Sequence, residues 1–134
     1  MNLHDYNDLI NLAKQQQEPQ RLLFVFAKAE LPENANEHQR DEFARGEGGT
    51  LVPTLCVDRT PDEVDQFSVL VSESEQTGFS WDIVFVAAMD GRAGIRATSE
   101  ECLQPLKMMM QQIQMGMISN FLAMNRKGDV VHLN

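Results

Sequence analysis

Amphipathic and apolar patterns alternate over the first thirty residues. Residues 5–17 place apolar side chains on one face at helical spacing, and Asp5 is a suitable first cap for that helix. Pro19 prevents the helix from continuing. The run 21–29, RLLFVFAKA, is apolar almost throughout and rich in aromatic and β-branched residues. Such a run predicts a strand that is covered on both faces.

A polar segment follows and leads into a second apolar run. Asn34 and Glu37 have the spacing of a capping box, which predicts a short polar helix that ends near Gly46. Residues 50–57, TLVPTLCV, then predict a strand. Pro53 lies inside this strand and lacks the amide hydrogen that a central strand needs, so it indicates an edge strand, a bulge or a break.

The segment DRTPDEVDQF carries a clear signal for the start of a helix. Thr60 is the expected cap, Pro61 takes the first helical position and Glu63 completes a capping box. Gly78 is expected to end this helix. Residues 81–89, WDIVFVAAM, form a third run that is apolar on both faces and predicts a third strand.

The last third of the chain predicts one long helix and a hairpin. Thr98 or Ser99 is expected to cap a helix that reaches about Met117, although Pro105 makes it start late or kink. The turn sequence NRKG separates FLAM from DVVHL, and Gly128 can take the positive φ that a tight hairpin requires.

These elements predict one compact domain over residues 1–134 in the order α-β-α-β-α-β-α-β-β. Alternation of helices with buried strands is typical of a parallel or mixed sheet flanked by helices. We therefore expect an α/β fold, with α+β as the alternative, built on about five strands that include the C-terminal β-hairpin.

Composition narrows the classes of function. Of the 134 residues 43% are apolar, which suffices for a core, and the net charge is -9. This acidic balance argues against nucleic-acid partners and anionic membrane surfaces, because both are bound by clustered basic residues. No apolar run approaches the roughly 20 residues that span a bilayer, and the N-terminus lacks the pattern of a signal peptide. With only two cysteines, a reduced cytoplasmic protein is expected.

Acidic residues close three of the predicted strands: Glu30, Asp58 and Asp90. In a parallel sheet the carboxyl ends of the strands share one edge, where ligands bind. The three carboxylates could there hold Mg²⁺ through oxygen ligands, with Arg59 or Arg92 neutralising a phosphate. The alternative interpretation is that these acids only favour turns and helix starts.

Other catalytic patterns are weaker. The three histidines lack metal-ligand spacing, and no serine or cysteine lies in a nucleophile elbow. Cys56, in an apolar strand, is interpreted as an inert core thiol. Cys102 lies near a helix start, which lowers a thiol pKa, but two glutamates beside it oppose that effect. The glycine cluster 46–49 follows a helix and precedes a strand, the reverse of a phosphate-binding loop.

Methionines are concentrated in the last helix: five of the eight lie between residues 108 and 117. Met109 and Met110 share its apolar face with Leu106, Ile113 and Met117, which core packing explains. Met108 and Met115 fall on or beyond the edges of that face. An apolar strip of this kind predicts a surface for a protein partner or a second subunit, and we assign Met108, Met115 and Met117 to it.

Four stretches, EPQRLLFVFAKAELP, GEGGTLVPTLCVDRTPDE, WDIVFVAAMDGR and GMISNFLAMNRKGDVVHL, span most of the chain. They resemble a family of small proteobacterial proteins of unknown function, some of which carry the label ribonucleotide reductase subunit alpha. The resemblance implies no established activity. The label does not suit this sequence, because the large reductase subunit is several times longer and uses a set of cysteines that Cys56 and Cys102 cannot supply.

The sequence thus favours a cytoplasmic, non-catalytic binding, regulatory or accessory module that acts through protein contacts and self-association. The alternative is a small-ligand-binding protein or Mg²⁺-dependent enzyme built on the carboxylates at the strand ends. Whether any reaction is catalysed stays open, with the balance against it. No resident cofactor is expected under the first interpretation.

Overall fold

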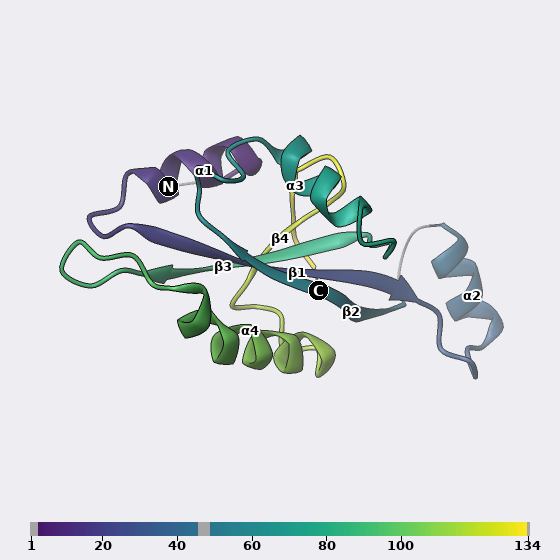
Figure 1. The fold of residues 1–134 in the computed structure, drawn as a ribbon. Coiled ribbons are helices and arrows are strands. Elements are labelled where there is room, and N and C mark those ends of the chain that lie inside the picture. The colour runs from purple at the N-terminus through teal and green to yellow at the C-terminus, as the bar shows by residue number, and fades with distance from the viewer. Residues whose placement is uncertain (1–2, 46–48, 134) are drawn as a thin grey trace.

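A computed structural model describes residues 3–45 and 49–133, and Figure 1 shows their arrangement. The nine predicted elements are present in the predicted order. They are α1 (Tyr6–Lys14), β1 (Gln20–Glu30), α2 (Glu37–Ala44), β2 (Thr50–Arg59), α3 (Phe67–Glu75), β3 (Ile83–Asp90), α4 (Ser99–Gln114), β4 (Leu122–Met124) and β5 (Val130–Val131). None of the described helices is long and apolar enough to cross a membrane.

The sheet is antiparallel throughout, so the expected parallel or mixed sheet is wrong and the fold is α+β. The strand order is β2-β1-β3-β4-β5, and each neighbouring pair runs in opposite directions. The physical reason lies in α2, which buries none of its residues and stands beyond the end of β1 and β2 (Figure 1). It does not cross the sheet, and β2 therefore returns directly beside β1.

Helices cover both faces of the sheet. α1 and α3 lie on one face and α4 lies on the other (Figure 1). Alternate residues of β1 supply the two layers of core, with Leu22, Phe24 and Phe26 toward α1 and α3. Leu23, Val25 and Ala27 belong to the layer under α4. This double coverage explains why β1 is apolar along almost its whole length.

β2 is an edge strand with a bulge, which confirms the interpretation of Pro53. Phe26 pairs with Leu55, whereas the next residue of β1, Ala27, pairs with Pro53. Thr54 is therefore the extra residue of the bulge. Because β2 is the first strand of the sheet and only β1 pairs with it, the missing amide hydrogen of Pro53 does not break a central ladder.

Two predicted helix starts need correction. The capping box of α2 joins Asn36 to Gln39, not Asn34 to Glu37, and its expected end at Gly46 lies outside the described residues. Thr60 and Glu63 do exchange their predicted hydrogen bonds, but they enclose a turn and α3 begins only at Phe67. The intervening Val64 is fully buried, and its carbonyl accepts a hydrogen bond from the hydroxyl of Tyr6 instead of continuing a helix.

Candidate functional site: the polar end of the sheet and the open edge

The three acids at the strand ends do not meet. Because neighbouring strands run in opposite directions, Asp58 and Asp90 lie at the end of the sheet where β1 begins, paired with Leu23 and Gln20. Glu30 lies at the opposite end, paired with Thr50. Within residues 3–45 and 49–133, no group of three or more potential metal ligands is assembled.

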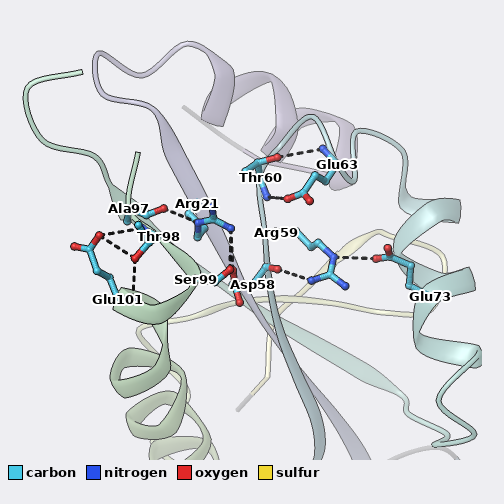
Figure 2. A network of polar contacts seen from close by, with 10 residues as sticks. All are labelled: Arg21, Asp58, Arg59, Thr60, Glu63, Glu73, Ala97, Thr98, Ser99 and Glu101. Atoms are coloured by element: carbon cyan, nitrogen blue, oxygen red, sulfur yellow. Dashed lines mark hydrogen bonds and ion pairs between the residues drawn. The ribbon is translucent and has the colours of Figure 1, made fainter. Parts of the chain in front are cut away.

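Asp58 is the centre of a polar network (Figure 2). Its Oδ2 lies 2.9 Å from the guanidinium Nη1 of Arg21 and accepts a hydrogen bond of 2.6 Å from the hydroxyl of Ser99. The Nε of Arg21 donates to the carbonyl of Ala97 at 2.6 Å. Only 15% of the Asp58 side chain and 17% of the Arg21 side chain are exposed. The carboxylate therefore fastens β2 to β1 and to the first residue of α4.

The other polar residues predicted for a ligand site are also engaged within the chain. Arg59 approaches Glu73 of α3 at 3.3 Å and donates to the backbone carbonyl of Asp58 at 2.7 Å (Figure 2). Asp90 accepts a 2.7 Å hydrogen bond from the buried Gln20. These contacts use the side chains to join elements of the fold.

Arg92 begins the tight turn that follows β3. Its amide and carbonyl both pair with Ile95, at 2.8 and 2.9 Å. The turn holds Ala93 at a φ of 52°, a left-handed conformation that few residues other than glycine adopt. Arg92 therefore stands at a loop tip and makes no described contact with Asp58. The arrangement does not bring the two arginines and three acids into one pocket.

Two capping carboxylates at this end are held ionised by backbone amides. The amide of Thr60 donates to Glu63 at 2.8 Å and lowers the pKa of that carboxyl. The amide of Thr98 does the same for Glu101 at 3.0 Å, again with a lowered pKa. In both pairs the threonine hydroxyl accepts in return from the glutamate amide, so the loops that enter the helical segments are fixed from both sides.

The cysteines reverse their expected environments. Cys56, interpreted as a core thiol, is exposed on the edge strand, whereas Cys102 is fully buried on the side of α4 that packs against the sheet. Desolvation raises the pKa of both thiols, and the charge of Asp58 raises each further. Neither thiol has the lowered pKa of a nucleophile.

The methionines assigned to a partner surface are all exposed. The exposed fractions are 49% for Met108, 72% for Met115 and 55% for Met117, whereas Met109 is buried. Met108 lies on the exposed side of α4, and Met115 is the C-cap residue that follows the last turn. α4 ends at Gln114, so Met117 lies beyond the helix and not on its apolar face.

A large open hollow, which the sequence analysis did not predict, lies at the opposite end of the sheet. Its volume is about 1140 Å³. Lys28, Asp82 and His132 are among its polar lining residues. The apolar lining includes Phe43, Leu51, Ile83, Ile113, Met115, Ile118 and Leu133. These residues come from segments that lie far apart in the chain, so no local pattern marks them.

The outer side of β2 is the longest open backbone edge in the described part of the chain. β2 spans ten residues, whereas β5 at the other edge of the sheet spans two. Thr50–Val57 carries no charged side chain. A smaller hollow of about 110 Å³ opens beside this edge, between β2 and α3, and its lining includes Leu55, Val57, Leu70, Ser74 and Thr77.

Comparisons with protein-family models, with curated proteins and with solved structures gave no match. The family resemblance of the sequence therefore stays a prediction. Two features bear most directly on function. One is a polar network whose groups are paired within the chain. The other is an edge strand whose outer backbone groups have no strand beside them in the described residues.

Proposed function

We propose that this protein is a non-catalytic binding or accessory module that acts through protein–protein contacts, and that the outer edge of β2 is its binding surface. The observation that carries the proposal is the open edge itself, ten residues long and uncharged over Thr50–Val57. We place the protein in the cytoplasm, where an exposed thiol such as Cys56 stays reduced.

An open edge of this kind favours strand addition. Its free amide and carbonyl groups can pair with an extended segment of another chain, and proteins normally guard such edges with charges, above all lysine. β2 has a bulge at Thr54 and a proline at position 53, but no charge before Asp58. The apolar side chains of Leu55 and Val57, both half-buried, would gain further cover from an added strand.

The alternative, a carboxylate site for Mg²⁺ or a polar ligand, finds less support. Asp58 already accepts from Arg21 and Ser99, and a metal ion would have to displace a cation and a hydroxyl that are both held in place. Glu30 lies at the far end of β1 and cannot contribute to the same ion. The charged side chains at the polar end instead pair with one another and so join elements of the fold.

Site-specific crosslinking in living cells tests the proposal. A photoreactive amino acid in place of Thr54, on the edge, should give covalent adducts with protein. The matched control places it at Lys127, which is exposed in the turn between β4 and β5. Adducts at Thr54 should be reduced by Cys56→Glu, which adds a charge to the edge, and kept by Cys56→Gln. Equal adducts at both positions, or none at Thr54, would contradict the proposal.

A further inference from the structure

We propose that the strand which pairs with β2 is the β2 of a second copy of this chain, running antiparallel, so that two five-stranded sheets join into one. This inference rests on the proposed function and names its partner. Three observations support it: the distribution of charge along the edge, the symmetry of the regular part of β2, and the shortness of the opposite edge.

Charge restricts where two copies can meet. Each chain has a net charge of -9, so most surfaces of two copies repel one another. The edge over Thr50–Val57 is uncharged. The two charges that follow are paired internally, Asp58 with Arg21 and Arg59 with Glu73. Two copies can therefore approach along β2 without bringing unpaired like charges together.

The bulge defines the register. The bulge at Thr54 divides β2 into two regular halves, Thr50–Pro53 and Leu55–Arg59. Pro53 has no amide hydrogen to offer, so the longer uninterrupted half is Leu55–Arg59, with Val57 at its centre. Antiparallel pairing about a two-fold axis normal to the sheet places Val57 opposite Val57 of the second copy. Cys56 then lies opposite Asp58 of the second copy, and every side chain keeps its own face of the sheet.

The side chains beside the edge suit this register. Leu55 and Val57 of the second copy would lie on the α3 face, against the hollow of about 110 Å³ beside Leu70. A cavity of about 150 Å³ holds a benzene ring, so this hollow has room for an aliphatic side chain. On the other face, Leu103 is 65% exposed and lies one turn after Ser99, whose hydroxyl reaches β2. Leu103 therefore lies on the side of α4 that faces the joined edge.

Pairing through β2 also ends with two copies. A two-fold contact uses the same surface on both chains and is closed. The remaining outer strand of each sheet, β5, has only two residues and offers little backbone for a further copy. An unrelated strand could pair with the same backbone groups, but no two-fold axis would then fix which of its residues lies opposite Val57.

A cysteine placed on the axis tests the register. In a Cys56→Ser background, Val57→Cys should form a disulfide-linked dimer under mild oxidation, because facing Cβ atoms in antiparallel pairs lie about 4.5–5.5 Å apart and need only a small shift. The control is Lys127→Cys in the same background. Both variants keep the buried Cys102, so it cannot account for a difference between them. Equal crosslinking of both variants, or none at position 57, would overturn the register.

Light scattering on the unlabelled protein gives a measurement that needs no new cysteine. The 15.2 kDa chain should have twice that mass in solution. In Cys56→Glu each new carboxylate would face Asp58 of the second copy, and the dissociation constant of the dimer should rise about tenfold or more. Cys56→Gln introduces a side chain of the same shape as glutamate but without its charge, and should change that constant by no more than about threefold. A monomer at high concentration, or a dimer indifferent to Cys56→Glu, overturns the inference.

The two proposals can fail separately. If the pure protein is monomeric while adducts at Thr54 in cells have the mass of this chain plus a different protein, the second copy is excluded and the open edge remains the binding surface. If the protein is monomeric and Thr54 gives no adducts, both proposals are overturned. Thr54 adducts of twice the chain mass, together with the Val57 crosslink, support both.

Discussion

The two ends of β1 differ in how their polar groups are used. Where the strand begins, Arg21 is bonded to Asp58, Ser99 and the carbonyl of Ala97, and β1, β2 and α4 are held together (Figure 2). Where it ends, Glu30 is exposed at the strand terminus, next to the hollow of about 1140 Å³ that Lys28 helps to line. An acidic residue at a strand end is therefore internally paired in one case, Asp58, and exposed to solvent in the other, Glu30.

This difference shows that the direction of a strand decides what its terminal acid can contact. Asp58 lies where the N-terminus of α4 and the side chain of Arg21 meet, so its carboxylate connects β2 to both. Glu30 leaves the sheet toward α2, which packs none of its side chains in the core. The polar end should accordingly be sensitive to substitution and the hollow end tolerant, and five measurements can test this contrast.

The largest contrast should come from the two basic residues of β1. Arg21→Met leaves the mostly buried Asp58 with Ser99 as its remaining side-chain partner, and the free energy of unfolding should fall by about 2–3 kcal/mol. Lys28→Met, at the exposed end, should change it by no more than about 0.5 kcal/mol. Urea unfolding measures both. Equal losses would remove the distinction between the two ends.

A double-mutant cycle on Arg21 and Asp58 separates the effect of their ion pair on stability from the effect of side-chain packing. Asp58→Asn added to Arg21→Met removes the unpaired charge, so the double variant should be more stable than Arg21→Met alone. If the double variant is less stable than the parent by the sum of the two single losses, the two residues act independently and Asp58 does not depend on Arg21 for its contribution to stability.

A smaller effect is expected for the hydroxyl in the same network. Ser99→Ala removes the 2.6 Å hydrogen bond to the Asp58 carboxylate and should cost about 1–1.5 kcal/mol in urea unfolding. Gln114→Ala is the matched helix substitution at the hollow end, where the side chain is exposed, and should change stability by only a few tenths of a kcal/mol. A larger loss at Gln114 would reverse the comparison.

The contribution of Glu63 to stability should depend on pH, and that of an exposed glutamate outside the polar end should not. Its pKa is lowered in the folded state, so its ionised form stabilises the fold above the ordinary value of about 4.3, and this contribution is lost as the pH falls through the lowered pKa. Glu63→Gln should therefore be less stable than the parent near pH 6 and approach it near pH 3. Glu33→Gln, in the exposed loop after β1, is the control; a parallel offset at every pH would contradict the prediction.

The smallest expected effect is that of Mg²⁺. Millimolar Mg²⁺ should leave the melting temperature unchanged at constant ionic strength, because Asp58 is already satisfied and Glu30 is at the other end. A ligand at 100 times its dissociation constant would add about 2.7 kcal/mol, so specific binding would be visible. A saturable rise that Asp58→Asn abolishes would restore the carboxylate site to consideration.

Local signals in the sequence predicted the elements well. Asp5 and Thr98 cap α1 and α4 as expected, Gly128 takes a φ of 82° in the terminal hairpin, and Pro53 marks an edge strand. Each of these depends on a few neighbouring residues, and the chain encodes them within one or two turns.

Strand direction and the hollow were not predictable in the same way. The segment of α2 has the length and polarity of a connecting helix, yet it buries no residue and β1 and β2 pair directly, in opposite directions. The partner of Asp58, Arg21, lies 37 residues away in the chain, and no spacing rule links them. The candidate site therefore depended on tertiary placement, while its individual acids were visible in the sequence.

The bulge at Thr54 has a consequence for changes in chain length. Losing one residue from a strand normally turns every later side chain to the opposite face of the sheet. In β2 the two halves are already offset by Thr54, so its deletion would bring Leu55 next to Pro53 and leave both halves paired as they are with Phe26 and Ala27. This strand can thus be shortened by one residue while every side chain keeps its face of the sheet, and its pairing with β1 then becomes regular.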